Sequence, residues 1–190
     1  DAWVINYTNP MTLCVKTLYR VFPEIKAFGC CHEVFGTQDI LAKMASVLFG
    51  EEIKRKDIKV NPIGVNHFTW LTKATYRNID LFPYYRQFCE KYKDGCTEYV
   101  DPEWLKGFHG NAHNVKIDLF RRFGYIAAAG DRHLAEFCEG KWYLENNDRV
   151  EEMLFHLTPV WSRKDELKER LAKSKRLLSG EEEIKLKLTG

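Results

Sequence analysis

A strand–helix–strand pattern in the first 30 residues constrains the fold more than any other feature of this sequence. Residues 3–7 form a short apolar run that ends at Asn9 and Pro10. Pro10 suits the first turn of a helix, and apolar side chains then recur at helical spacing until Pro23. Residues 25–30 form a second apolar run. A helix that joins two strands over so short a distance predicts a parallel pair with a right-handed crossover.

The sequence changes character between residues 55 and 65. Before this point we expect a second helix that Thr37 caps and Gly50 ends, because apolar side chains repeat there at helical spacing. After it, we expect strands at 58–61 and 65–76, an irregular stretch at 94–114, and helices at 81–92, 115–123, 150–156 and 164–178. The pattern therefore predicts two domains, residues 1–57 and 58–190.

Composition narrows the class of protein. The 29 Lys and Arg residues nearly balance the 27 Asp and Glu residues, so nucleic acid is not an expected partner. No apolar run approaches the ~20 residues of a membrane span, and there is no signal-peptide pattern, so we expect no membrane contact. Six scattered cysteines indicate reduced thiols and a cytoplasmic location. The sequence opens directly on an expected strand, and residues 184–190 follow an alternating pattern that stops unfinished. Both features predict that this sequence is a piece of a longer protein.

A candidate metal site follows from two segments that end apolar runs. Residues 29–34 read GCCHEV, and residues 64–68 read GVNHF. We expect Cys31 and His67 to lie at the edge where open α/β sheets place their chemistry. Thiolate and imidazole bind zinc, manganese and similar ions, and two protein ligands leave coordination positions for water or substrate. From these residues alone, a buried free cysteine beside a hydrogen-bonded core histidine is the commoner arrangement.

A second candidate site begins at Asp131, which follows an apolar run and a glycine. Its carboxylate could act as a general base, and Arg132 could bind a carboxylate or phosphate through two parallel hydrogen bonds. The simpler interpretation is that Asp131 caps a helix beside an ion-paired arginine, and these residues alone favour it. His109 and His113 have the spacing of a helical zinc pair but lack the glutamate between them, so they predict a substrate contact only weakly.

Four segments together resemble glycoside hydrolase family 4: residues 6–10 (NYTNP), 30–34 (CCHEV), 64–67 (GVNH) and 130–132 (GDR). They occur in the order and the approximate spacing of that family. The resemblance implies an α/β fold in which the end of a Rossmann-like parallel sheet is followed by an α+β catalytic domain, as in lactate and malate dehydrogenases. The glycine-rich phosphate loop of such proteins has no counterpart in this sequence, so we expect residues 1–57 to be the last part of an NAD-binding domain.

Members of this family require NAD and a divalent metal, usually manganese, and act on small carbohydrate substrates. The resemblance implies that NAD takes hydride from C3 of the sugar, that a base removes the C2 proton, and that the glycosidic bond is lost by elimination. The metal would stabilise negative charge on the sugar oxygens before water adds back. On this basis Cys31 and His67 are the expected metal ligands.

The remaining site residues also follow from the resemblance. Asn9 matches an asparagine between the substrate and the nicotinamide, and His32 is expected to contact a sugar hydroxyl and to take part in catalysis. Asp131 matches the base of some members, and Tyr125 is a reserve candidate because other members use a tyrosine. Asn66 is expected on the substrate side of the site.

The substrate that the resemblance implies is an α-galacturonide. The CHEV form of residues 31–34 looks most like members that act on such sugars, and Arg132 with His133 suits a sugar carboxylate. α-Galactosidase and α-glucosidase activities stay open. So do a malate- or lactate-type dehydrogenase, which Cys31 with His67 disfavours, and an inactive interaction fragment. Relatives of this family are usually oligomeric, which implies a dimer or tetramer.

Overall fold

The computed structural model describes residues 2–107, 110–157 and 159–183. The chain divides into two compact units, residues 1–156 and 157–190. The predicted domain boundary between residues 57 and 58 falls inside the first unit, where a second sheet begins, and it stays a prediction. The alternating pattern at residues 184–190 lies outside the described residues.

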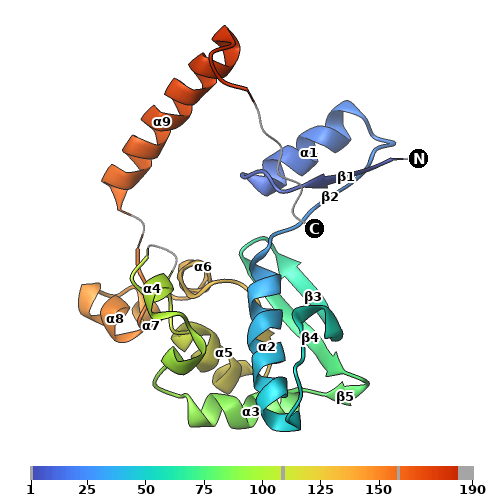
Figure 1. The fold of residues 1–190 in the computed structure, drawn as a ribbon, viewed down its shortest axis with the longest axis vertical. Coiled ribbons are helices and arrows are strands. Elements are labelled where there is room, and N and C mark those ends of the chain that lie inside the picture. Colours follow the sequence, from blue (N-terminus) through green and yellow to red (C-terminus); the bar gives the residue numbers. More distant parts are fainter. Residues whose placement is uncertain (1, 108–109, 158, 184–190) are drawn as a thin grey trace. The chain divides into compact units, whose positions relative to one another are not determined.

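The predicted strand–helix–strand pattern at the N-terminus is confirmed. Strands β1 (Trp3–Asn6) and β2 (Lys26–Gly29) are parallel, and helix α1 (Met11–Val21) joins them (Figure 1). The Cys30 amide donates a hydrogen bond to the Asn6 carbonyl over 3.1 Å, so the two carboxyl ends lie side by side. In parallel sheets this edge is where ligands bind.

The second sheet is antiparallel and is built on one long hairpin. Its strands are β3 (Ile58–Val65), β4 (Phe68–Tyr76), β5 (Ile79–Asp80) and β6 (Ile126–Ala127), and β4 pairs with the other three. Asn66 and His67 form the two-residue turn between β3 and β4. The sequence predicted both long strands but ended the first at residue 61. The register shifts between Asn61 and Pro62, because proline has no N–H for the ladder, and the strand continues beyond this irregularity.

Seven helices of the first unit are described after β2, with two short 3-10 turns. They are α2 (Glu33–Phe49), α3 (Phe82–Lys91), α4 (Pro102–Leu105), α5 (Asn114–Phe123), α6 (Asp131–Phe137), α7 (Gly140–Tyr143) and α8 (Asn147–Glu152), and the turns are η1 (Arg55–Asp57) and η2 (Thr97–Tyr99). The α8 helix begins before the expected residue 150 because the Asn146 side chain accepts a hydrogen bond from the Arg149 amide.

The sequence predicted that Thr37 caps this helix. That prediction is wrong, because α2 begins earlier, at Glu33. Thr37 lies inside the helix and is fully buried. The apolar spacing that predicted this helix starts only at Ile40, and it carries no information about the more exposed first turn. The error matters for function, because the true start puts Glu33 in the first turn.

Helix α5 lies between two apolar clusters. The larger cluster joins α2, α3 and β4 to one side of α5, and Leu41, Leu71, Tyr85 and Phe120 are at most 1% exposed there. The smaller cluster joins the other side of α5, including Leu119, to α6 and α7. Figure 1 shows α2 running alongside the β3–β4 hairpin. These clusters fix the N-terminal ends of α2, α5 and α6, which carry Glu33, Lys116 and Asp131.

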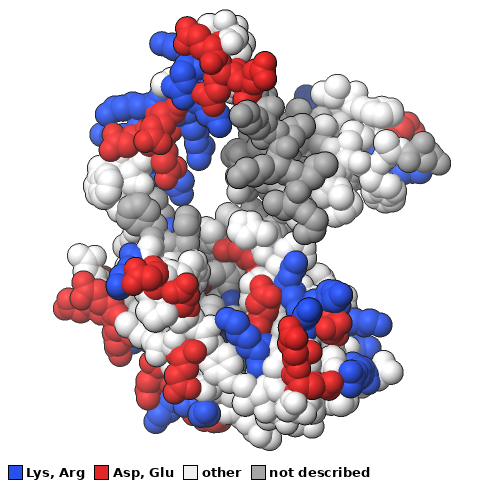
Figure 2. Space-filling model, in the orientation of Figure 1, with Lys and Arg blue, Asp and Glu red and all other residues white. Residues whose placement is uncertain are grey.

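In the second unit, helix α9 (Val160–Ser179) is longer than the expected 164–178. Arg163 and Arg170 both pair with Glu166, one turn away along the helix. Figure 2 shows both signs of charge mixed over this helix, as the sequence predicted for a surface helix.

Two bulk predictions can be compared with the structure. All six cysteines are free thiols, in agreement with the prediction of reduced cysteines. None of the helices in the described part of the chain combines the length and the apolar character that a membrane crossing requires.

Candidate metal centre

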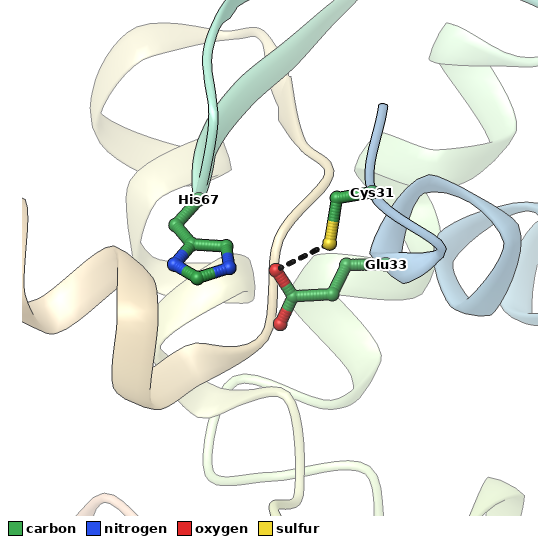
Figure 3. A group of neighbouring side chains, drawn as sticks. All are labelled: Cys31, Glu33 and His67. Atoms are coloured by element: carbon green, nitrogen blue, oxygen red, sulfur yellow. Dashed lines mark hydrogen bonds between the residues drawn. The ribbon is translucent and has the colours of Figure 1, made fainter. Parts of the chain in front are cut away.

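Cys31 and Glu33 come from the junction between β2 and α2. Cys31 follows shortly after the end of β2, and Glu33 is the first residue of α2. Figure 3 shows both side chains reaching into the same space, with the Glu33 carboxylate between the Cys31 sulfur and the His67 ring. A carboxylate in the first turn of a helix is also stabilised by the unpaired backbone N–H groups at that end.

His67 enters from the turn between β3 and β4. Its φ angle is 67°, a left-handed conformation that costs a residue with a Cβ about 1–3 kcal/mol. Gly64 shortly before it has a φ of 113°, and a Cβ at this position would lie 2.5 Å from the Phe68 carbonyl oxygen. Strained backbone of this kind clusters at functional sites. Here the strained turn places a ring nitrogen of His67 within 4.8 Å of the ligand atoms of Cys31 and Glu33.

The three side chains have the ligand types of a metal site. Cys31 Sγ, a Glu33 carboxylate oxygen and a His67 ring nitrogen all lie within 4.8 Å of one another, and all three residues are half-buried. The Cys31 thiol donates a hydrogen bond to Glu33 Oε2 over 3.6 Å. The structure therefore brings together the two residues that the sequence predicted as metal ligands, and it adds Glu33.

His133 and Gly130 hold the other oxygen of Glu33. His133 Nδ1 donates to Oε1 over 2.7 Å, because a carboxylate can only accept, and the Gly130 amide donates to the same oxygen over 3.0 Å. Burial raises the pKa of Glu33, but the hydrogen bond and charge of His133 and the Gly130 amide outweigh burial and lower the pKa to about 2. Glu33 is therefore a carboxylate at neutral pH.

The His67 and His133 rings are stacked, with centroids 3.8 Å apart and planes 2° from parallel. Burial and the charge of His133 lower the pKa of His67, which favours the neutral imidazole that binds metals. Burial raises the pKa of Cys31; the backbone amide of Glu33 opposes this shift, and the Glu33 carboxylate adds to it. A divalent cation between these groups would instead favour the thiolate.

Asn9 and Asn66 meet at the same turn. Asn66 Nδ2 donates to Asn9 Oδ1 over 3.2 Å, which ties the loop after β1 to the turn that carries His67. Asn66 Oδ1 is buried, and within the described ranges it has no hydrogen-bond partner. An amide oxygen can accept a hydrogen bond from a ligand hydroxyl. His32 lies at the N-cap of α2 and is exposed. The contacts of Asn9, Asn66 and His32 with the substrate, and of Asn9 with the nicotinamide, stay predictions.

Asp131 is fully buried and serves helix α5. Its two carboxylate oxygens accept hydrogen bonds from the backbone amides of Val115 and Lys116 over 3.1 and 3.2 Å. Asp131 therefore caps α5 and not α6, the helix to which it belongs. Burial raises the pKa of Asp131 to about 6, although the Lys116 charge and the two amides oppose this shift. A role as catalytic base would require this carboxylate to leave α5, and that role stays a prediction.

The other predicted site residues have different surroundings. Arg132 is half-buried, and its positive charge acts on His67. Tyr125 is 52% exposed and lines an open pocket of 590 Å³ between β4, β5 and the end of α5. His113 is the N-cap residue of α5, and its Nδ1 atom is buried. His109 lies outside the described residues.

The fold and the cluster define a class of protein: an α/β protein with a thiolate, a carboxylate and an imidazole placed to bind one divalent cation. Comparison with known proteins then gives the family. A model described as "Family 4 glycosyl hydrolase" matches residues 1–47, and one described as "Family 4 glycosyl hydrolase C-terminal domain" matches residues 62–187. The chain belongs to this family, as the resemblance implied, and the match decides against a malate- or lactate-type dehydrogenase.

Several relatives match over the whole chain. An alpha-galacturonidase from Thermoanaerobacterium saccharolyticum is 55% identical over 100% of this chain and 41% of its own length. An alpha-galacturonidase from Bacillus subtilis is 48% identical over 100% of this chain and 42% of its own length. The chain thus spans about two-fifths of the length of the curated relatives it matches.

Solved structures agree with the fold. The crystal structure of the Bacillus subtilis protein lplD is 49% identical, with a TM-score of 0.78 over 94% of this chain and 41% of that chain. A 6-phospho-alpha-glucosidase from gut microorganisms, solved with NAD and Mn2+, is 22% identical, with a TM-score of 0.53 over 94% of this chain and 38% of its own. The predicted α/β fold, a Rossmann-like parallel part followed by an α+β part, is confirmed.

Glu33 is the site residue that sequence reasoning did not select. Its signal was present, because it lies two residues after Cys31 in the same segment. A helix that was expected to start at residue 37 left Glu33 in an undefined loop. The actual start of α2 directs its side chain at Cys31 and His67.

Proposed function

We propose that this chain forms part of an α-galacturonidase. One observation carries the proposal: four curated proteins named alpha-galacturonidase are 48–55% identical to it over the whole chain. An alpha-galactosidase from Bacillus subtilis is only 30% identical over 72% of the chain. The higher identities support an α-linked galacturonide over the neutral sugar as the proposed substrate class.

The residues of the candidate metal centre fit the divalent metal that the family resemblance implies. Cys31 and His67 would hold the ion, with the Glu33 carboxylate within 4.8 Å of both ligand atoms. When bound, NAD would accept hydride from C3, and the metal would act as a Lewis acid on the adjoining sugar oxygens. The parallel ends of β1 and β2 suit a cofactor that approaches from the Asn9 side.

The chain's own residues would orient the sugar around this centre. Asn9 and Asn66, which are hydrogen-bonded to each other, would contact sugar hydroxyls through their amide groups. His32, exposed at the start of α2, would bind a further hydroxyl. Arg132 would attract the sugar carboxylate, because its charge lies close enough to act on His67.

Asp131 remains the proposed base that removes the C2 proton. Its pKa of about 6 suits a carboxylate that must accept a proton near neutral pH. Both of its oxygens are engaged with the amides of α5, so the reaction would need a movement of the junction between α5 and α6. Tyr125 is the alternative base. A reducing cytoplasm would suit a site that depends on a free thiol.

A substrate comparison tests the proposal. A protein of the relatives' full length that contains this sequence should hydrolyse an aryl α-galacturonide at least about tenfold faster than the matching α-galactoside and α-glucoside, because the sugar carboxylate meets Arg132. Equal rates, or a preference for a neutral sugar, would reject the galacturonide assignment. With a C2-deuterated substrate, the label should exchange with solvent, and retention of the label in the product would reject the elimination route.

A further inference from the structure

We propose that Glu33 is a third protein ligand of the metal, and that His133 is the positioning residue that aims it. This inference rests on the proposed function, since it concerns the same metal. The family resemblance assigns only Cys31 and His67 to the ion. The addition of Glu33 turns a two-ligand site into a three-ligand site that faces substrate on its open side.

The first support is the distance between two atoms. Cys31 Sγ and Glu33 Oε2 lie 3.6 Å apart. Sulfur at about 2.3 Å and oxygen at about 2.1 Å from one tetrahedral ion would be separated by about 3.6 Å. A His67 ring nitrogen lies within 4.8 Å of both ligand atoms, so a small side-chain rotation would complete the set.

The second support is the way in which Glu33 is held. Oε1 accepts hydrogen bonds from His133 Nδ1 and from the Gly130 amide, which leaves Oε2 directed at Cys31. A Cβ on Gly130 would lie 2.8 Å from Oε1, so a side chain at this position would displace the carboxylate. Metal-binding carboxylates are oriented in this manner by hydrogen bonds to the oxygen that does not bind.

The third support is the link between His133 and a second ligand. The His133 ring stacks on the His67 ring at 3.8 Å while its Nδ1 bonds to Glu33. One side chain therefore restrains two of the three ligands. His133 contacts two of the proposed ligands but does not belong to the group of three, so its role is to position Glu33 and His67.

A divalent cation would be compatible with the charges at this centre. In the structure the Cys31 thiol donates to Glu33, and a bound cation would replace that proton and neutralise both the resulting thiolate and the carboxylate. A carboxylate that served only as a hydrogen-bond acceptor for Cys31 and His133 would not explain the strained turn that brings His67 to the same point.

Measurements of Mn2+ binding to the 190-residue chain test whether Glu33 is a metal ligand. Mn2+ affinity would be measured by titration calorimetry, and Co2+ absorption would report thiolate coordination. Glu33→Gln should weaken Mn2+ binding by more than about 100-fold, beyond the effect of most supporting residues. The matched control is Glu136→Gln, which removes another carboxylate whose charge acts on His67 and should change the affinity less than about threefold.

Two variants of His133 separate its hydrogen bond from its ring. His133→Phe keeps the stack on His67 but removes the bond to Glu33, and it should weaken Mn2+ binding about tenfold. His133→Asn can place an amide N–H near the position of Nδ1 and should restore most of the affinity. An equal loss in both variants would overturn the positioning role. Thermal unfolding of the metal-free proteins checks that each variant folds.

A Mn2+-loaded crystal structure of the same chain gives the direct answer. The inference predicts a metal–Oε2 distance of about 2.0–2.2 Å. A distance above about 3 Å with a water between them, or wild-type affinity in Glu33→Gln, would overturn it. If Cys31→Ser abolishes binding while Glu33→Gln does not, only the role of Glu33 fails. If the wild-type chain binds no Mn2+, the metal assignment in the proposed function fails as well.

Discussion

Lys116 Nζ donates a hydrogen bond to Thr37 Oγ1 over 3.0 Å, and both side chains are buried. Thr37 lies one turn after Glu33 on α2, and the Lys116 backbone amide bonds to Asp131. The N-terminal ends of α2, α5 and α6 are thus joined by one polar network adjoining the metal centre. Burial lowers the pKa of Lys116, and the carboxylates of Asp131 and Glu33 oppose this shift.

Because of this network, we expect removal of the Asp131 carboxylate to destabilise the folded chain. Asp131→Ala should lower the free energy of unfolding by about 3–5 kcal/mol, because it leaves a buried lysine without its counter-charge and two helix amides without an acceptor. Lys116→Met in the same background should recover part of the loss. Urea unfolding of the two single variants and of the double variant measures the coupling.

The control for this experiment is an exposed ion pair. Glu103 and Lys106 are 2.7 Å apart on the surface, and Glu103→Ala should cost less than about 1 kcal/mol. Strict additivity of the Asp131 and Lys116 effects would show that the two charges are independent and would contradict the network.

Asp131 also shows how far the sequence can predict this site. A carboxylate after a glycine predicted a helix cap, and a cap is what Asp131 provides, but for the helix 16 residues earlier in the chain. Local sequence carries the capping preference, whereas the choice between α5 and α6 depends on how the two helices pack. The parallel pair β1–β2 could be predicted because both strands and their connection lie within one short segment.

Glu33 and His133 show the opposite limit. Their hydrogen bond joins residues 100 positions apart, and no spacing in the sequence encodes it. Cys31 and His67 could be predicted as a pair only because both follow apolar runs at strand ends and because a family resemblance supported them. The left-handed turn at His67 lies in a two-residue hairpin connection at residues 66–67, whereas the sequence predicted the break between the strands at residues 62–64 and placed His67 inside the second strand.

The buried carboxyl of Asp131 predicts a dependence of stability on pH. Burial raises its pKa to about 6 from an ordinary value of 3.8. Between these two values the folded protein binds more protons at this site than the unfolded chain, so this contribution to stability falls as pH rises. Two pKa units correspond to about 3 kcal/mol. The free energy of unfolding of the wild type, relative to Asp131→Asn, should therefore decrease by roughly that amount between pH 4 and pH 7. Parallel curves for the two proteins in urea titrations would contradict the assignment.

We expect a side chain at position 64 to destabilise the β3–β4 hairpin and to weaken metal binding. Gly64→Ala would place a Cβ 2.5 Å from the Phe68 carbonyl at a φ of 113°, so the turn must shift. We expect the free energy of unfolding to fall by about 2 kcal/mol and Mn2+ binding to weaken, because His67 moves with the turn. The matched control is Gly36→Ala inside α2, where a Cβ meets nothing within 4 Å. That variant should gain up to about 1 kcal/mol from helix propensity and should leave metal binding unchanged.

The cysteines predict a labelling pattern that reports on the centre directly. Burial raises the pKa of Cys89 and of Cys96 to about 12, so neither should react with iodoacetamide at pH 8 in the folded chain. Cys30 and Cys31 are both half-buried and should react, and all six cysteines should react in urea.

Mn2+ should then distinguish the two adjacent thiols. At a metal concentration ten times Kd, about nine-tenths of the sites are filled, so labelling of Cys31 should slow about tenfold. Cys30 is the internal control and should keep its rate, because only Cys31 belongs to the group with Glu33 and His67. Peptide mass spectrometry resolves the two rates. Equal protection of both thiols would indicate that the metal acts through a general change in structure, and the assignment of Cys31 as the ligand would fall.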